Sequence, residues 1–333
     1  MGDPAGIGGE LAARLAHSDA LAAGGEVRLV IFGDRHVYAA GASAGGLPGT
    51  LPMISEDAAA DAREFASLVN VPLAESACIH AGKPSLSAGL FAQRNFQAAL
   101  NLARSGHASA VVYMPLNKRS MRLADESYDD DIDFIEKCLE TGRPASEFNI
   151  LDDLWNARVT SHIPLSAVAS RISINQIIAA AELTEKTMRA AGHERPRIAV
   201  AGLNPHAGDG GNYGREEIEI IAPAVAAAES RGLDITGPYP ADTIFLMARS
   251  GRFDAVLTMF HDQGQIAMKL MGFDRGVTLI AGYDFPICTP AHGTAFDIVG
   301  KGTASTGAAE NAVLLAARLS GPRLHPPREK QGA

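Results

Sequence analysis

The stretch DAVLTMFH at residues 254–261 decides the fold class of this chain. Its apolar run is continuous rather than alternating, which is typical of a strand that is buried on both faces of a parallel sheet. The run ends at His261, and ligands in open α/β sheets bind beyond the C-terminal ends of the strands. We therefore expect a buried strand over 254–260 that delivers His261 to a ligand site.

Strand-like and helical segments alternate along the rest of the chain. β-branched runs predict strands at 27–33, 110–114 and 197–201, and Ala-rich stretches predict helices at 88–104, 174–191 and 215–231. Ser173 or Asn175 can cap the start of the second of these helices. Such an alternation predicts an α/β protein with a largely parallel sheet.

The composition limits the class of protein. With 333 residues the chain is expected to form two lobes, because single cores stop growing near ~250 to 300 residues. Its net charge of -9 argues against nucleic-acid and membrane-surface partners, which need a basic face. Cys78, Cys138 and Cys288 are too widely spaced to indicate a disulfide framework or a structural zinc site. Because no membrane-spanning run or signal-peptide pattern occurs, we expect a cytoplasmic protein.

The first ten residues, MGDPAGIGGE, form a Gly/Pro-rich motif. A loop of this kind normally follows a strand. We therefore expect a strand ahead of Met1 that the numbered chain does not contain.

Three histidines lie in short polar motifs that are far apart in the sequence. These motifs are SH at 161–162, NPHAG at 204–208 and FHDQGQ at 260–265. Neutral imidazoles from separate loops suit zinc, iron, cobalt, nickel and manganese. Each histidine alone is better explained as a polar loop residue, but the shared setting favours a metal site. His162, His206 and His261 are therefore candidate metal ligands, and the alternative is that they serve as hinge and capping residues of their loops.

The block HGTAFDIVGKG at 292–302 has the composition of a nucleotide-binding loop. Its glycines let backbone donors approach a cofactor, and Asp297 can accept hydrogen bonds from adenosine groups. The chain has no GxGxxG motif, so a standard Rossmann dinucleotide site is not indicated. The alternative is a loop whose glycines serve turns.

Lys269, Asp242 and Lys118 each have a functional and a structural interpretation. Lys269, eight residues after His261, can meet a substrate anion as a point charge or lie on the surface. Asp242 can act as an acid or base, or cap the helix that follows it. Lys118 lies just beyond a predicted strand end and has the same two interpretations.

Taken together, these motifs resemble the 4-hydroxythreonine-4-phosphate dehydrogenase family, within the larger isocitrate/isopropylmalate dehydrogenase-like fold. The matching segments run in the expected order over nearly the whole chain. They are GDPAGIG at 2–8, NK at 117–118, SH at 161–162, NPHAGDGG at 204–211, GREE at 214–217, PADT at 240–243, HDQGQ at 261–265, Lys269 and HGTA at 292–295.

The resemblance implies an architecture and a set of cofactors. It implies a homodimer whose active site lies in an interdomain cleft, between a nucleotide-binding domain (1–125 plus 288–333) and a metal, substrate and dimerisation domain (126–287). It further implies a divalent metal, zinc or else magnesium, manganese or cobalt, on the three histidines. Catalysis is assigned to Asp242 and Lys269. An NAD or NADP site is assigned to Asn117, Lys118, His292, Gly293, Thr294 and Asp297.

The substrate pocket departs from the family pattern. Where the family usually has GHTE, this chain has DDID at 130–133, so Asp131 and Ile132 replace a histidine and a threonine that touch substrate. The family's substrate-facing Asn and Arg align with Thr278 and, approximately, with Ile287. Losing a cation while gaining acid is hard to reconcile with a tightly held phosphate. We therefore predict that these four residues contact a different substrate.

The departures favour a metal-dependent NAD(P) dehydrogenase that oxidises, and decarboxylates, a hydroxy acid without phosphate. An aromatic dicarboxylate cis-dihydrodiol of the terephthalate type fits this description. The alternatives within the family are 4-hydroxythreonine 4-phosphate and 4-phospho-threonate as substrates. A non-catalytic regulator that binds metal and nucleotide is the alternative of another class.

Overall fold

Two sheets form the framework of the described residues, which in this computed structural model are 1–25, 27–73, 79–272 and 274–321. The strands are β1 Leu29–Gly33, β2 Met53–Ile54, β3 Ala66–Asn70, β4 Val111–Val112, β5 Ser146–Leu151, β6 Leu154–Arg158, β7 Ile198–Ala201, β8 Ile235–Tyr239, β9 Ala255–Thr258, β10 Val277–Ala281 and β11 Ile287–Pro290. One sheet has the order β1-β3-β2, and the other has the order β4-β11-β10-β5-β6-β9-β7-β8.

The strand pairings confirm the predicted α/β class with largely parallel strands. Both pairings of the smaller sheet are parallel, as are β4 with β11, β6 with β9, and β7 with both β8 and β9. The three antiparallel pairings are consecutive in the larger sheet, from β11 through β10 and β5 to β6. The middle of the larger sheet is therefore antiparallel, which the sequence pattern did not predict.

The helices agree with the predicted segments. They are α1 Gly8–Ala16, α2 Asp19–Ala23, α3 Arg35–Ala44, α4 Leu86–Arg104, α5 Lys118–Ala124, α6 Asp131–Leu139, α7 Val168–Arg171, α8 Ile174–Ala190, α9 Ala222–Ser230, α10 Ala241–Arg249, α11 His261–Gly272 and α12 Gly307–Ser320. Ser173 caps α8 by accepting a hydrogen bond from the backbone N–H of Gln176. The predicted helix over 215–231 is divided between a π-helical turn, η5 (Glu217–Ile221), and α9.

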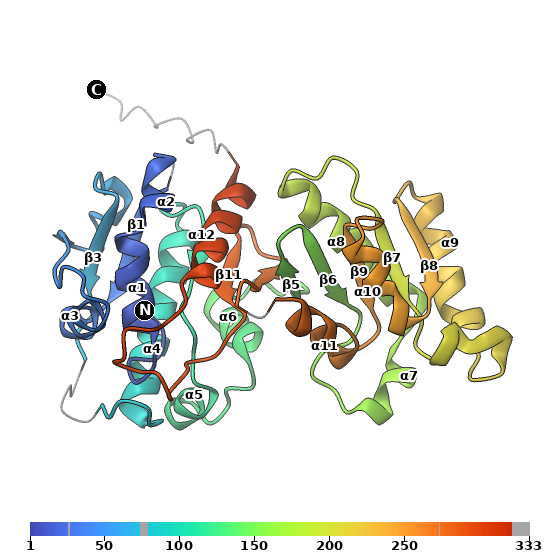
Figure 1. Cartoon of the computed structure of the whole chain (residues 1–333), viewed down its shortest axis with the longest axis horizontal. Helices are drawn as coiled ribbons and strands as arrows, with labels where there is room; N and C mark the ends of the chain where they lie inside the picture. Colours follow the sequence, from blue (N-terminus) through green and yellow to red (C-terminus); the bar gives the residue numbers. More distant parts are fainter. Residues whose placement is uncertain (26, 74–78, 273, 322–333) are drawn as a thin grey trace.

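Figure 1 shows an elongated molecule of two lobes. β1, β3 and α3 lie at one end and β8 and α9 at the other, while β11 and β5 lie near the middle with β10 between them. The red C-terminal helix α12 lies in the lobe of the blue N-terminal segments, and α8 to α11 surround the other half of the larger sheet. The domain boundaries predicted at 125/126 and 287/288 stay a prediction.

The strand predicted at 254–260 is fully enclosed in the second lobe. All four residues of β9 are buried between β6 and β7. Leu257 packs in a core with residues of α8 and α9, whereas its neighbour Val256 packs in a separate core with residues of α10 and α11. Helices therefore cover both faces of this strand, which explains why its apolar run does not alternate with polar residues.

A cavity of about 930 Å³ lies between the two sheets, bordered by β1 on one side and β4 on the other. Residues 1–3 contact both sides of it. The amino group of Met1 donates to the carbonyl of Phe32 at 2.6 Å, and the N–H of Asp3 donates to the carbonyl of Pro115 at 3.0 Å. The expectation of a strand ahead of Met1 stays a prediction.

Among the described residues, no helix is both long and apolar enough to cross a membrane. Cys288 is buried and Cys138 is partly buried, and neither forms a disulfide. Cys78 lies outside the described residues.

Candidate functional site

Two of the three predicted histidines lie together beyond the ends of neighbouring strands. β6 and β9 are parallel, and Arg158 pairs with Thr258, so both strands end at the same edge of the sheet. His162 follows β6 by four residues, and His261 is the first residue of α11 after β9. Their ring centroids are 5.5 Å apart. The buried strand predicted at 254–260 is observed as β9, with His261 just beyond its end, and the ligand site at His261 stays a prediction.

A carboxylate holds each of these imidazoles. The Nδ1 of His162 lies 3.0 Å from Asp130 Oδ2, and the Nδ1 of His261 lies 2.7 Å from Asp262 Oδ1. The bond to His162 lowers the pKa of Asp130 to about 2. Burial lowers the pKa of His261, which favours the neutral ring. Nδ1–H donation to a carboxylate leaves Nε2 as the free lone pair, so this pair fits a divalent metal.

His206 lies apart from this pair, on a loop with an unusual backbone. Five consecutive residues of the segment η4 (Pro205–Gly211), from His206 to Gly210, have φ between 44° and 81°. His206 is exposed. Within the described residues, no three His, Cys, Asp or Glu side chains are grouped closely enough to hold a metal. One subunit therefore brings together two of the three predicted ligands.

The buried carboxylate of Glu217 holds the start of the His206 loop. Its Oε1 accepts the backbone N–H groups of Leu203 and Asn204, both at 2.7 Å, and its Oε2 accepts the Asn204 amide at 2.9 Å. Glu217 is 3 % exposed, so its carboxylate makes these bonds away from water. The motifs NPHAG and GREE, thirteen residues apart from Asn204 to Glu217, are thus parts of one structural unit.

A buried arginine lies beneath the histidine pair, and the sequence interpretation did not identify it. Arg158, at the end of β6, is 4 % exposed and forms an ion pair with Glu147. Its Nη1 also donates to Asn149 Oδ1 at 3.0 Å, and the same oxygen accepts the Gln265 amide at 2.8 Å. Burial lowers the pKa of Arg158 to about 10. The signal that could have identified Arg158 is a cation at the end of an otherwise apolar strand.

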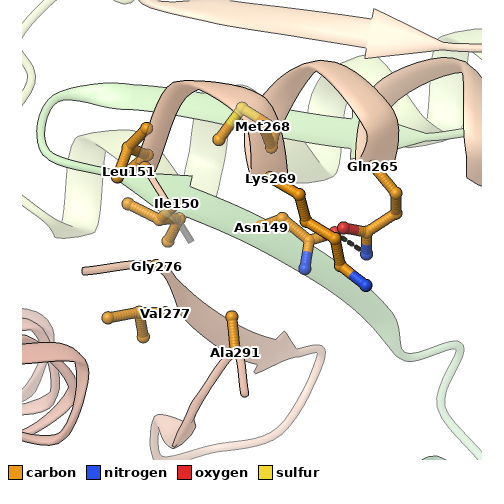
Figure 2. Close-up of a pocket in the computed structure, with 10 residues that line it drawn as sticks. Asn149, Ile150, Leu151, Gln265, Met268, Lys269, Gly276, Val277 and Ala291 are labelled. Atoms are coloured by element: carbon orange, nitrogen blue, oxygen red, sulfur yellow. Dashed lines mark hydrogen bonds between the residues drawn. The ribbon is translucent and has the colours of Figure 1, made fainter. Parts of the chain in front are cut away.

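Lys269 borders a small pocket beside this network. Figure 2 shows Lys269 and Gln265 extending from α11 near Asn149, above a recess lined by β5 and β10. The pocket has a volume of about 20 Å³, and Ala291, next to His292, lies on its far side. Lys269 is exposed at the border of this pocket.

Asp242 does not cap the helix that follows it. The N-cap position of α10 is Pro240, which has no capping side chain, and Asp242 lies exposed in the first helical turn. The capping interpretation is therefore wrong, because the helix starts at Ala241, two residues earlier than a cap at Asp242 requires. α10 contacts the η4 segment, which contains His206.

The predicted cofactor loop packs against the N-terminal motif. The Ile7 N–H donates to the Thr294 carbonyl at 3.1 Å, and His292 Nδ1 lies 3.1 Å from the Gly293 carbonyl. The Nε2 of His292 is buried without a hydrogen-bond partner among the described residues. Gly293 and Asp297 are exposed. The Nε2 of His292 is an unused polar group at this loop.

Asn117 and Lys118 start α5, some distance along the chain from that loop. Asn117 is the N-cap residue, and its side chain accepts the Ser120 N–H at 3.0 Å. Lys118 is exposed. The structure therefore gives Asn117 a capping role and leaves Lys118 open to solvent.

The four predicted substrate residues lie in different settings. Asp131 accepts hydrogen bonds from the hydroxyl groups of Tyr113, at 2.8 Å, and Tyr128. Ile132 is partly buried against the core that α4 and α6 share, and Ile287 is 0 % exposed in that core. Thr278 accepts a hydrogen bond from Asn149 at 3.3 Å. Ile287 thus has no surface open to a substrate in this arrangement.

Comparisons with known proteins agree with the motif pattern. The family model for the pyridoxal phosphate biosynthetic protein PdxA matches residues 26–316. The chain is 51 % identical to the "Putative 4-hydroxythreonine-4-phosphate dehydrogenase 2" of Rhizobium meliloti (strain 1021), over 96 % of this chain and 92 % of that protein. It is 35 % identical to the D-threonate 4-phosphate dehydrogenase of Salmonella typhimurium, over 96 % of this chain and 97 % of the relative.

Two solved structures resemble the whole chain. The 4-hydroxythreonine-4-phosphate dehydrogenase of Klebsiella pneumoniae superposes with a TM-score of 0.80 at 33 % identity, covering 96 % of this chain and 98 % of that one. The terephthalate 1,2-cis-dihydrodiol dehydrogenase of Burkholderia xenovorans LB400 superposes with a TM-score of 0.65 at 26 % identity, with 96 % of each chain covered. The relative named for a phosphorylated substrate is the more similar of the two.

Proposed function

The chain belongs to the pyridoxal phosphate biosynthetic protein PdxA family, and we propose that it oxidises the CH–OH group of a phosphorylated hydroxy acid. Candidate substrates are 4-hydroxythreonine 4-phosphate and threonate 4-phosphate, because relatives that match nearly the whole chain are named for them. The aromatic dihydrodiol that the pocket departures suggested has less support, since its namesake structure is less similar.

The observation that carries this proposal is the His162–His261 pair, held by two carboxylates at the ends of β6 and β9. In this arrangement each ring directs Nε2 away from its carboxylate, as a metal ligand requires. A divalent metal held by these imidazoles would lower the pKa of the substrate hydroxyl, and NAD or NADP would supply the acceptor for the hydride.

We assign the third ligand, His206, to the second subunit of a homodimer. His206 is exposed, and it does not group with His162 and His261 within one subunit. An exposed histidine on a loop that Glu217 holds is suited to reach a neighbouring copy. Because Asp242 lies on a helix that contacts the same loop, it would come from that second subunit too.

The remaining residues provide charge and proton transfer. We assign binding of the substrate anion to Lys269, which lies on the same helix as His261. We assign acceptance of the hydroxyl proton to Asp242, and cofactor binding to the loop from His292 to Asp297. Oxidation of a hydroxyl that is β to a carboxylate gives a β-keto acid, which can lose carbon dioxide.

A turnover assay with defined metal and cofactor tests this function. The purified protein is loaded with zinc, cobalt, manganese or magnesium and given NAD or NADP. The substrates are 4-hydroxythreonine 4-phosphate, threonate 4-phosphate and the terephthalate cis-dihydrodiol, with reduced nicotinamide and carbon dioxide as readouts. We expect a kcat/KM at least about 100-fold higher for one phosphorylated substrate, because a held phosphate contributes several kcal/mol.

The other outcomes of this assay are equally informative. A higher kcat/KM for the dihydrodiol would contradict the assignment of a phosphorylated substrate. Metal and nucleotide binding without turnover of any of the three would favour the non-catalytic regulator.

A further inference from the structure

Asp130 connects the histidine pair to the other lobe. It is the N-cap residue of α6, a helix whose side chains Phe134 and Ile135 pack in the core that also contains Phe96 of α4. Its partner His162 lies 32 residues further along the chain, in the loop that follows β6.

We propose that Asp130 is a positioning residue that holds the His162 imidazole, through its Nδ1, in the orientation and tautomer that leave Nε2 free for the metal. This inference rests on the proposed function, because it takes His162 as a metal ligand. It adds a residue that acts through His162 and does not itself touch metal or substrate.

The two oxygens of Asp130 have separate tasks. Oδ1 accepts the backbone N–H of Asp133 at 2.9 Å, which caps α6, and Oδ2 lies 3.0 Å from His162 Nδ1. A carboxylate oxygen can only accept, so it selects the imidazole tautomer with its proton on Nδ1. The first turn of α6 thereby fixes the Asp130 side chain before any metal binds.

The orientation of His162 depends on its contact with Asp130 more than the orientation of His261 depends on its contact with Asp262. The His162 side chain is 42 % exposed, so packing leaves its ring much freedom to rotate. His261 obtains its carboxylate from the next residue, Asp262, and so carries its own partner on α11. His162 obtains its carboxylate from another lobe. Its orientation is therefore set only when α6 lies against the loop after β6.

The same helix connects the ligand to the expected substrate pocket. Asp131, the next residue, is held by the hydroxyl groups of Tyr113 and Tyr128. Burial, reinforced by the charge of Asp131, raises the pKa of both tyrosines, which keeps them protonated as donors. The start of α6 is therefore fixed on both sides, at Asp130 and at Asp131, and it places the metal ligand relative to the substrate.

The test uses Asp130→Asn, with Asp129→Asn as its matched control. Asparagine is as good an N-cap as aspartate, so α6 keeps its start. When the amide oxygen caps the helix, the amide NH2 faces Nδ1 and donates to it, which moves the imidazole proton to Nε2 and blocks the ligand. Asp129 is an exposed neighbour, and its substitution removes the same charge without altering the contact to His162.

Two measurements on the full-length protein give the result. Titration of the metal-free protein with zinc or cobalt alone is expected to show a dissociation constant about 10- to 100-fold weaker for Asp130→Asn, with Asp129→Asn unchanged. Nitrogen-15 NMR of labelled, metal-free protein is expected to show the His162 proton on Nδ1 in the parent and on Nε2 in the variant. Both changes require a thermal unfolding midpoint close to that of the parent.

Two results would contradict these expectations, and they differ in which claim they overturn. If Asp130→Asn binds metal as tightly as the parent, the positioning role is overturned while the proposed function stands. If His162→Ala also binds metal as tightly as the parent, His162 is not a ligand, and the metal site of the proposed function is overturned as well.

Discussion

The His162–His261 pair and the His206 loop use opposite means to present an imidazole. The pair lies beyond two buried parallel strands, and each ring is held by a carboxylate. His206 is exposed on a run of five residues with positive φ, held from below by Glu217. The difference shows that strand ends can assemble ligands within one subunit, whereas a protruding loop is suited to contribute one to a neighbour.

The largest expected effect is on the pair itself. His261→Ala should lower kcat/KM by about 1000-fold or more, because the loss of a metal that stabilises the alkoxide costs several kcal/mol. Metal content after dialysis and turnover are the measurements, with the exposed His36→Ala as control. If His261→Ala retained as much metal as the parent, the His162–His261 pair would not be part of the metal site.

The second effect concerns the support beneath the pair. Arg158→Met leaves the carboxylate of Glu147 without its buried partner, and we expect a loss of about 3 kcal/mol in the free energy of unfolding. Denaturant titration measures it. Arg197→Met, which breaks an exposed pair with Asp254, should cost at most about 1 kcal/mol. Equal losses in the free energy of unfolding of the two variants would show that burial does not increase the contribution of the Arg158–Glu147 pair to stability.

The third effect concerns the support of the His206 loop. Glu217→Gln keeps one oxygen for the two backbone N–H groups but turns its NH2 group toward the Asn204 amide donor, so we expect a loss of about 2 kcal/mol in the free energy of unfolding. The control is Glu219→Gln, whose exposed pair with Arg215 contributes little. If the two variants unfold at the same denaturant concentration, the loop is not held by Glu217.

The smallest effect is a pH dependence at the pair. Because burial lowers the pKa of His261, the unfolded chain binds a proton there more readily than the folded protein. The stability of the metal-free protein should therefore fall as the pH drops through about 6.5, the value of a free histidine. His261→Gln should remove part of this slope between about pH 7.5 and 5.5. An identical slope in the variant would contradict the cause given for the shift.

The sequence predicted the strands and helices that carry the site residues better than it predicted the contacts between those residues. The apolar run at 254–260 and the cap at Ser173 were sufficient to place β9, His261 and α8, because periodicity and capping are local properties. The contact between Asp130 and His162 spans 32 residues and depends on how two lobes pack, which no local pattern contains. The antiparallel centre of the sheet and the burial of Ile287 were missed for the same reason.

The departures in the pocket show the limits of reasoning by substitution. Asp131 was expected to face the substrate as an added negative charge, but two tyrosine hydroxyls hold its carboxylate. Arg158, a cation that no motif indicated, lies close enough to influence the ionisation of His261. The carboxylate of Asp131 is thus engaged within the protein, and the charge of Arg158 is balanced by its ion pair with Glu147.

Mixed dimers test the central account most directly. His261→Ala and His206→Ala subunits, each inactive alone, are given different affinity tags and coexpressed, and the heterodimer is purified. If His162 and His261 of one subunit work with His206 of the other, this heterodimer has one intact site and about half the parent turnover per dimer. A heterodimer as inactive as either parent variant would contradict the account, because all three histidines would then act within one subunit.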